Sequence, residues 1–259
     1  MRAWLDWGRG FNVRLAAENK AVVVKRKTQI LAGAVWLTLT ASAFAQGTFQ
    51  NLDFEAANLP SVPVGGFVSS LSAIPSWTAY FSTNVTTQIW HNNYALGAVN
   101  ISIIGPGFSG PASFPVIQGS YSVFLQSGLD GTATTRMSAA IAQTGIIPLT
   151  AMSLRFSVGS YLAGDPAQLV VSIGGQNIPI FPLTITASQT VYGADISGFA
   201  GQTKELRLTS FPSQSDPYHY FLIDSIAFSN QQIPEPNALG LIGIGALMFG
   251  WRLKTKRLL

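Results

Sequence analysis

The sequence predicts an all-β fold, an antiparallel β-sandwich, over residues 46–230. Short runs of Val, Ile, Thr, Ser, Phe and Tyr recur there and are broken by Gly, Pro and Asn, which is the pattern of strands joined by turns. No stretch keeps the 3.6-residue apolar spacing and the caps of a helix. Gly174-Gly175 separates two such runs and predicts a tight hairpin. Many short strands without helices between them are typical of a sandwich.

Twelve segments are expected to form strands. In chain order they are residues 49–55, 77–80, 86–90, 99–104, 121–126, 134–143, 152–158, 169–173, 177–185, 190–196, 205–209 and 220–228. Within 121–126 and 152–158, alternate residues can face a core while the others face away from it.

Two motifs carry a resemblance to a known fold. Asn51-Leu52-Asp53-Phe54-Glu55 lies near the start of this region, and Ile223-Asp224-Ser225-Ile226 lies near its end. With Gly119–Leu125 between them, the order resembles the galactose-binding-like jelly roll, which is common in extracellular bacterial proteins and carbohydrate-binding modules. The resemblance implies that the first and last strands lie close together.

Charge is concentrated at the two ends of the chain. Of the 15 Lys and Arg residues, seven lie within residues 1–27 and four within 252–257, which leaves Arg136, Arg155, Lys204 and Arg207. Nine of the 11 acidic residues lie between these ends, so the central part carries a charge of −5. It lacks the basic surface that nucleic-acid binding requires, so no nucleic-acid partner is expected. The absence of cysteine excludes disulfides and thiol chemistry.

Residues 231–259 show three parts in a fixed order. Pro234, Glu235 and Pro236 form a rigid acidic turn, because proline fixes φ and removes a backbone donor. An apolar run over 238–251 is expected to form a short hydrophobic helix, shorter than the roughly 20 residues of a standard membrane span. A basic cluster follows, which favours the cytoplasmic side of a membrane. The cluster consists of Arg252, Lys254, Lys256 and Arg257.

This order resembles the PEP-CTERM sorting signal of exopolysaccharide-producing Gram-negative bacteria. The resemblance implies that an exosortase, a membrane-embedded enzyme, processes the chain near Pro234-Glu235-Pro236. It also implies export: transit through the inner membrane, with at least transient membrane contact through the C-terminal helix, and then delivery to the cell surface or the extracellular matrix. The alternative interpretation of the same residues is a permanent membrane anchor.

A signal peptide is expected within residues 1–45. A basic run at 25–27 precedes an apolar stretch, and the small residues Ala43 and Ala45 follow it, which is the order of a secretory signal peptide. We place cleavage after Ala45, so that Gln46 becomes the first residue of the mature chain. The residues ahead of the basic run form an N-terminal extension that suggests a mis-assigned start.

No catalytic residue is predicted. His91 and His219 are the two histidines, and each is expected to lie exposed in a loop or at a strand end. The Gly-x-Ser-x-Gly nucleophile motif does not occur. Asp130, Asp165 and Asp216 precede Gly or Pro in turn dipeptides, so no acid pair stands out for a glycosidase.

Two binding sites are considered. Asp53, Glu55 and Asp224 offer oxygen ligands from the first and last strands, which would suit a structural Ca²⁺, and the jelly-roll resemblance points the same way. Trp90, Asn92 and Tyr94, at a strand end that runs into a loop, could bind a glycan by stacking and hydrogen bonding. The alternatives are ordinary turn acids at the first site and a core tryptophan at the second.

The sequence therefore predicts a non-enzymatic exported protein of the cell surface or matrix. Its role would be structural or weakly glycan-binding in exopolysaccharide or biofilm. The competing functions are a carbohydrate-active enzyme of the glycoside-hydrolase kind and a permanently membrane-anchored surface protein.

Overall fold

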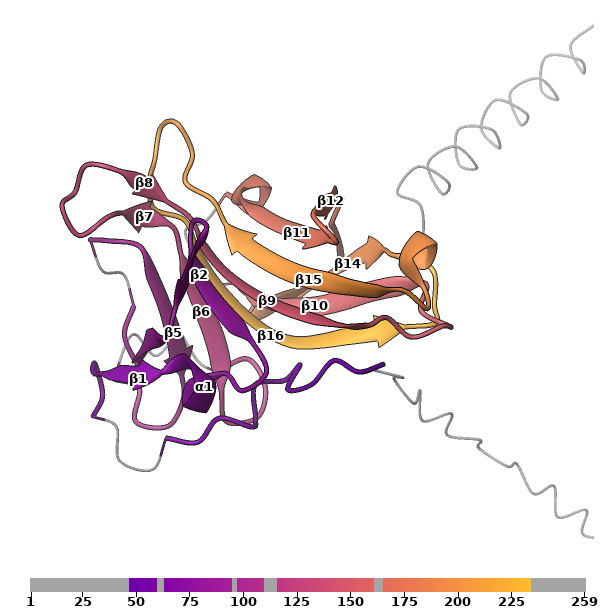
Figure 1. The fold of residues 1–259 in the computed structure, drawn as a ribbon, viewed down its shortest axis with the longest axis horizontal. Helices are drawn as coiled ribbons and strands as arrows, with labels where there is room; N and C mark the ends of the chain where they lie inside the picture. Colours follow the sequence, from indigo (N-terminus) through magenta and orange to yellow (C-terminus); the bar gives the residue numbers. More distant parts are fainter. Residues whose placement is uncertain (1–46, 60–62, 95–96, 110–115, 161–164, 234–259) are drawn as a thin grey trace, which may run out of the picture. The chain divides into compact units, whose positions relative to one another are not determined.

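The computed structural model describes residues 47–59, 63–94, 97–109, 116–160 and 165–233. These residues form two β-sheets and one small hairpin (Figure 1). The predicted all-β sandwich is confirmed.

The larger sheet, sheet A, contains the first strand of the chain, β1, and the last, β16. Its strands are, in spatial order, β1 (Phe67–Ser69), β4 (Gln88–His91), β5 (Asn100–Ile104), β6 (Ser122–Gln126), β16 (Tyr220–Ser229), β10 (Ser153–Gly159), β14 (Gln189–Asp195) and β13 (Phe181–Ile185). Neighbouring strands run antiparallel except β4 and β5, which pair in parallel.

The smaller sheet, sheet B, is antiparallel throughout its described strands. In spatial order these are β12 (Gln176–Ile178), β11 (Leu169–Ile173), β15 (Thr203–Ser210), β9 (Ala139–Ile146), β2 (Thr78–Phe81) and β3 (Asn84–Thr86). The short elements outside the two sheets are the hairpin of β7 (Gly128–Leu129) and β8 (Arg136–Met137), the helix α1 (Ser70–Ala73), and the 3-10 turns η1 (Pro166–Gln168) and η2 (Ser197–Phe199).

The main core lies between the two sheets. Phe156 and Phe228 from sheet A and Ile141, Leu206 and Leu208 from sheet B are all buried in one cluster. Figure 1 shows β9 and β15 lying against β10 and β16, as this packing requires. Because side chains alternate along a strand, the neighbours of these residues face away from the core.

A second cluster covers the outer face of sheet A. Ile104, Phe124 and Leu222 are buried there, and Tyr94 and Phe108 from the loop segments around β5 pack against them. The outer face of sheet A is therefore partly occupied by the chain's own loops.

The predicted Gly174-Gly175 hairpin is confirmed. Ile173 pairs with Gln176 across a two-residue turn. Gly174 and Gly175 have φ values of 57° and 81°, as a type I′ turn requires at both central positions.

The predicted strand over 49–55 is wrong. Asn51 and Phe54 have φ values of 50° and 60°, and the Phe54 and Ala57 amides donate to the carbonyls of Asn51 and Phe54. These turns bury Leu52 and Phe54 without strand geometry. The expected proximity of the two motifs is nevertheless found, because the Ile226 amide donates to the Leu52 carbonyl at 2.9 Å.

Among the described residues, no helix is long and apolar enough to cross a membrane. The predicted signal peptide and C-terminal hydrophobic helix lie outside those residues.

Candidate functional site

A groove of about 360 Å³ lies on the outer face of sheet B. Its described lining comes from the β2–β3 turn, from β8 and the residue that joins it to β9, and from β15 and the residues after it: Ser82, Thr83, Arg136, Ser138, Arg207, Thr209, Phe211 and Pro212. Arg207 and Thr209 reach this face because they alternate with the core residues Leu206 and Leu208.

Arg207 is held by two contacts. Its guanidinium carbon lies 4.0 Å from the centre of the Tyr80 ring, which is a cation–π contact. Its Nε and Nη2 donate to Oε1 and Oε2 of Glu205 at 3.0 and 3.5 Å. The Arg207 side chain is 25% exposed. The guanidinium is therefore held in one orientation, while part of the Arg207 side chain stays exposed in the groove.

Arg136 lines the same groove from a different element. Its Nη1 donates to the carbonyl of Ser213, which ties the β7–β8 hairpin to the loop after β15. Figure 1 shows this hairpin close to the end of β15. Phe211, which is 41% exposed, also lines the groove. Ser138 and Thr209 are lining residues as well, and both are largely buried.

This groove was not among the predicted binding sites. Arg136 and Arg207 were recognised only as two of four basic residues in the central part of the chain. The signal that could have revealed the site was the Glu205-x-Arg207-x-Thr209 alternation on an otherwise apolar strand, because it places three polar groups on one face.

Trp90, a predicted glycan ligand, lies half-buried on β4. Its ring packs against that of Phe67, its register partner on β1, with 3.9 Å between ring centroids and 31° between the ring planes. Phe67 is 56% exposed. The pair therefore forms an aromatic surface at the β1 edge of sheet A.

Asn92 and Tyr94, the other predicted glycan ligands, contact their own loop segments. Asn92 is buried, with its Nδ2 donating to the Pro106 carbonyl at 2.8 Å and its Oδ1 accepting from the Gly105 amide at 2.7 Å. Tyr94 packs edge-on against Phe108 at 5.4 Å between centroids. These contacts stabilise the loops on sheet A, and glycan binding by either residue stays a prediction.

The predicted metal ligands Glu55 and Asp224 converge on one loop, residues 117–122. Glu55 Oε1 accepts from the amides of Ser120 and Tyr121 at 2.8 and 2.9 Å. Asp224 Oδ2 accepts from the Gln118 amide at 3.1 Å and from the Ser122 hydroxyl at 2.7 Å. The two carboxylates thus hold neighbouring parts of this loop.

Asp224 is fully buried beside a β-bulge in strand β16. Burial raises the pKa of the Asp224 carboxyl from 3.8 to about 6. Hydrogen bonds from Ser122, Ser225 and Gln118 act in the opposite direction, and the negative charge of Glu55 adds a small upward contribution to the pKa.

Asp53, the third predicted ligand, is exposed, and its Oδ1 accepts from the Glu55 amide at 3.4 Å. Within the described ranges, no three acidic or histidine side chains converge as a metal ion would require. Glu55 and Asp224 are already held by N–H and O–H donors. The calcium site stays a prediction, and these contacts do not favour it.

Both histidines are buried, contrary to the expectation that they lie exposed. His91 is 6% exposed at the end of β4, and His219 is 5% exposed just before β16. His219 Nδ1 accepts from the Asp165 amide at 3.2 Å. Both histidines lie at strand ends, and the spacing of residues in the sequence does not reveal whether a strand end is buried.

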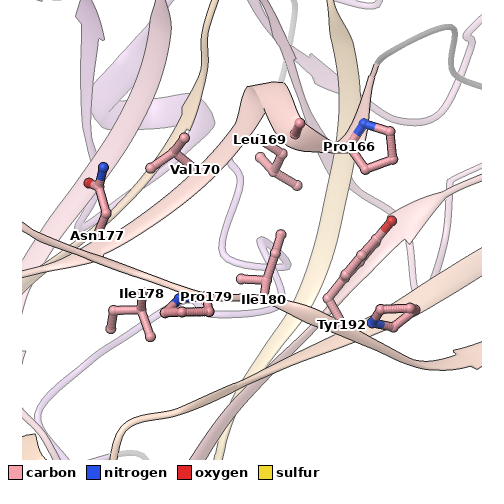
Figure 2. A pocket seen from close by; sticks show the side chains of 10 residues that line it. Pro166, Leu169, Val170, Asn177, Ile178, Pro179, Ile180 and Tyr192 are labelled. Atoms are coloured by element: carbon pink, nitrogen blue, oxygen red, sulfur yellow. The ribbon is translucent and has the colours of Figure 1, made fainter. Parts of the chain in front are cut away.

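An apolar groove of about 560 Å³ lies where the edge strands of the two sheets approach each other. Figure 2 shows Leu169, Ile178, Ile180 and Tyr192 around it. Its described lining includes Asn177 and Tyr192 but no charged residue, whereas the groove on sheet B has two arginines.

The last described residues are fastened to the outer face of sheet A. The Ser153 hydroxyl donates to the Gln231 carbonyl at 2.7 Å, and Arg155 Nη2 donates to Gln231 Oε1 at 3.1 Å. Ile233 lies over Gly193, where a Cβ would come within 2.4 Å of its Cδ1. Attachment to the domain therefore continues to the residue before Pro234.

The predicted cleavage residues Ala43, Ala45 and Gln46 lie outside the described residues. The same holds for the predicted sorting residues, which are Pro234, Glu235, Pro236, Arg252, Lys254, Lys256 and Arg257.

Three solved structures resemble the chain at low TM-scores. TmCBM61 in complex with beta-1,4-galactotriose has 13% identity and a TM-score of 0.35, covering 70% of this chain and 97% of its own. A cyclase from Fischerella sp., in apo form, has 12% identity and a TM-score of 0.39, with coverages of 70% and 93%. A family 11 carbohydrate-binding module from Clostridium thermocellum, with a mixed-linked tetrasaccharide, has 10% identity and a TM-score of 0.33, with coverages of 66% and 99%. At these TM-scores the similarity supports no conclusion about a ligand or an activity.

No curated protein matches the sequence. A protein-family comparison does match the end of the chain, at residues 232–257. This match agrees with the order of turn, apolar run and basic cluster there, and it indicates export by an exosortase system to the cell surface. The chain thus carries a PEP-CTERM protein-sorting motif at residues 232–257.

Proposed function

We propose that the protein is an exported surface protein whose sandwich domain binds glycan without catalysis, through the groove on sheet B. The observation that carries the proposal is the composition of the groove. Two guanidinium groups, an exposed phenylalanine and several hydroxyls line one depression.

These groups match the chemistry of a sugar. A sugar ring has an apolar face that packs on an aromatic ring and an edge of hydroxyls that needs fixed hydrogen-bond partners. Phe211 offers the first, and the exposed residues Arg136 and Thr83 offer the second. Arg207 is already ordered by Tyr80 and Glu205, so little side-chain entropy would be lost on binding.

The same composition favours binding over hydrolysis. The described lining residues include no carboxylate and no histidine, and a glycosidase needs a pair of acids across the scissile bond. Asp224 has the raised pKa of a general acid, but it is fully buried and accepts hydrogen bonds from the 117–122 loop. We therefore assign Asp224 a structural role.

A glycan array probed with the purified protein tests this proposal. We expect binding that Phe211→Ala weakens severalfold, because the substitution removes one exposed ring from the groove. Ile185→Ala is the matched control, since Ile185 is an equally apolar exposed residue on β13. Equal binding by both variants and the unaltered protein would contradict binding through the groove on sheet B.

The enzyme alternative is tested separately. Incubation with the polysaccharides that bind on the array is expected to release no reducing ends. Release that Asp224→Asn abolishes would favour a carbohydrate-active enzyme instead.

The Phe67–Trp90 pair is a second candidate glycan surface. It is supported by the contact between the two rings and by the exposure of Phe67. Trp90→Ala on the same array separates the two surfaces, because Trp90 lies on sheet A and the groove lies on sheet B. The biological role that follows is retention in the exopolysaccharide matrix or biofilm.

A further inference from the structure

The basic residues of the central part of the chain are unevenly placed. Only Arg136, Arg155, Lys204 and Arg207 lie between the two basic ends, in a region of charge −5. Arg136 and Arg207 line one groove, although they come from different strands. Arg155 is bonded to Gln231 on sheet A, and Lys204 lies against Gly174. The groove on sheet B therefore gathers half of this region's positive charge.

The two guanidiniums keep donors for a ligand. Arg207 uses Nε and Nη2 for Glu205, and its Nη1 has no hydrogen-bond partner among the described residues. Arg136 uses Nη1 for the Ser213 carbonyl, and within the same described ranges its Nε and Nη2 have no partner. Both side chains line the groove, so these donors can serve a group bound there.

The net charge of the groove indicates which charge a ligand should carry. With Arg136 and Arg207 against Glu205, the site has a net charge of +1. A guanidinium presents a planar fork that pairs with the two oxygens of a carboxylate. A carboxylate of charge −1 would neutralise the site, whereas a more highly charged anion would meet Glu205 and the surrounding acidic domain.

We propose that the groove binds glycans that contain carboxylate-bearing sugars, the uronic acid class, with the carboxylate between Arg136 and Arg207. This assignment rests on the proposed glycan-binding function. The exposed Thr83 then contacts sugar hydroxyls, and Phe211 packs against the ring beside the acidic one.

The test compares acidic oligosaccharides with their own neutral forms. Oligogalacturonates, oligomannuronates and oligoglucuronates are titrated into the full chain by calorimetry, and so are the same oligosaccharides after reduction of each carboxyl group to a primary alcohol. We expect at least one acidic series to bind roughly tenfold or more tightly than its reduced form, since a charge-assisted pair is lost on reduction.

Arg136→Gln is the informative variant, because Arg136 is exposed and contributes nothing to the core. It is expected to weaken acidic binding roughly tenfold while changing neutral binding less than about twofold. Lys204→Gln is the matched control: it removes the same charge from β15, outside the groove, and we expect it to leave acidic binding unchanged.

The outcomes distinguish the uronate assignment from the glycan-binding function on which it rests. Equal affinity for acidic and reduced forms overturns the uronate assignment and leaves glycan binding standing. Failure of every titrated oligosaccharide to bind overturns the uronate assignment, and absence of binding on the glycan array as well overturns both. Equal losses in Arg136→Gln and Lys204→Gln show unspecific attraction and overturn the site. Tighter binding of sulfated oligosaccharides than of uronates overturns the choice of carboxylate.

Discussion

At Asp224, burial and hydrogen bonding act on one carboxylate in opposite directions. Burial dominates and raises its pKa to about 6. The folded state therefore holds the Asp224 proton more tightly than the unfolded chain, where the ordinary value of 3.8 applies. This group contributes stability at low pH that is lost as the pH rises from about 4 through 6.

Asp224→Asn is expected to remove that loss. The free energy of unfolding of the variant minus that of the unaltered protein should rise by up to about 3 kcal/mol from pH 4 to pH 7. The reason is that one unit of pKa shift corresponds to about 1.4 kcal/mol. Urea unfolding at several pH values measures the difference. Parallel pH curves for the two proteins would show that Asp224 is not the buried group described above.

A chelator tests the calcium prediction for Asp53, Glu55 and Asp224. If Ca²⁺ binds the native state there, EDTA lowers the melting temperature by a few degrees and added calcium restores it. Glu55→Gln should abolish this response while the protein remains folded. A melting temperature that EDTA leaves unchanged excludes the site.

Among the elements, the β11–β12 hairpin shows what residue identity can specify. Its turn was predictable because two consecutive glycines accept the positive φ values that the turn needs. Gly175→Ala should cost about 1 kcal/mol of stability, since an L-residue is strained at φ 81°.

No atom lies within 4 Å of a Cβ built at Gly175, so this loss would come from the backbone alone. Gly198→Ala is the control, because Gly198 also has open space but no positive φ. Thermal unfolding of both variants measures the contrast, and equal melting temperatures would mean that the turn relaxes without strain.

Most strands were predictable because their residues are β-branched or aromatic and end at Gly, Pro or Asn. Segment 49–55 shows the limit of this signal. Leu52 and Phe54 alternate with polar residues as in a strand, yet Asn51 Oδ1 accepts a hydrogen bond from the Ala56 amide and starts a turn. The short strands β1, β3 and β7 were missed, since two or three residues carry too little pattern.

At the scale of the whole molecule, the sorting motif was more predictable from the sequence than the groove on sheet B. The sorting motif is contiguous, so its three parts can be recognised from sequence order. The groove on sheet B depends on the pairing of β9 with β15, which brings Arg136 near Arg207. That register is a tertiary property, and the sequence spacing of the two arginines does not contain it.

Processing by an exosortase is expected to depend on the turn ahead of the apolar run. Replacing Pro234 and Pro236 together by alanine should leave a full-length, membrane-retained protein in a host that has the exosortase. The unaltered chain should behave the same way in a host from which the exosortase gene is deleted. Fractionation and mass analysis of the product measure both effects, and normal release in the deletion strain would contradict sorting by this route.

The central claim is that the exported domain binds glycan through the outer face of sheet B. Amide chemical-shift mapping by NMR, with a glycan selected on the array, tests it most directly. The account predicts shifts concentrated at Ser82 and Thr83, at 136–138 and at 207–212, with the residues around Trp90 and Asp224 unchanged. Saturable shifts confined to the β1 edge of sheet A, or no saturable shifts with any glycan on the array, would contradict it.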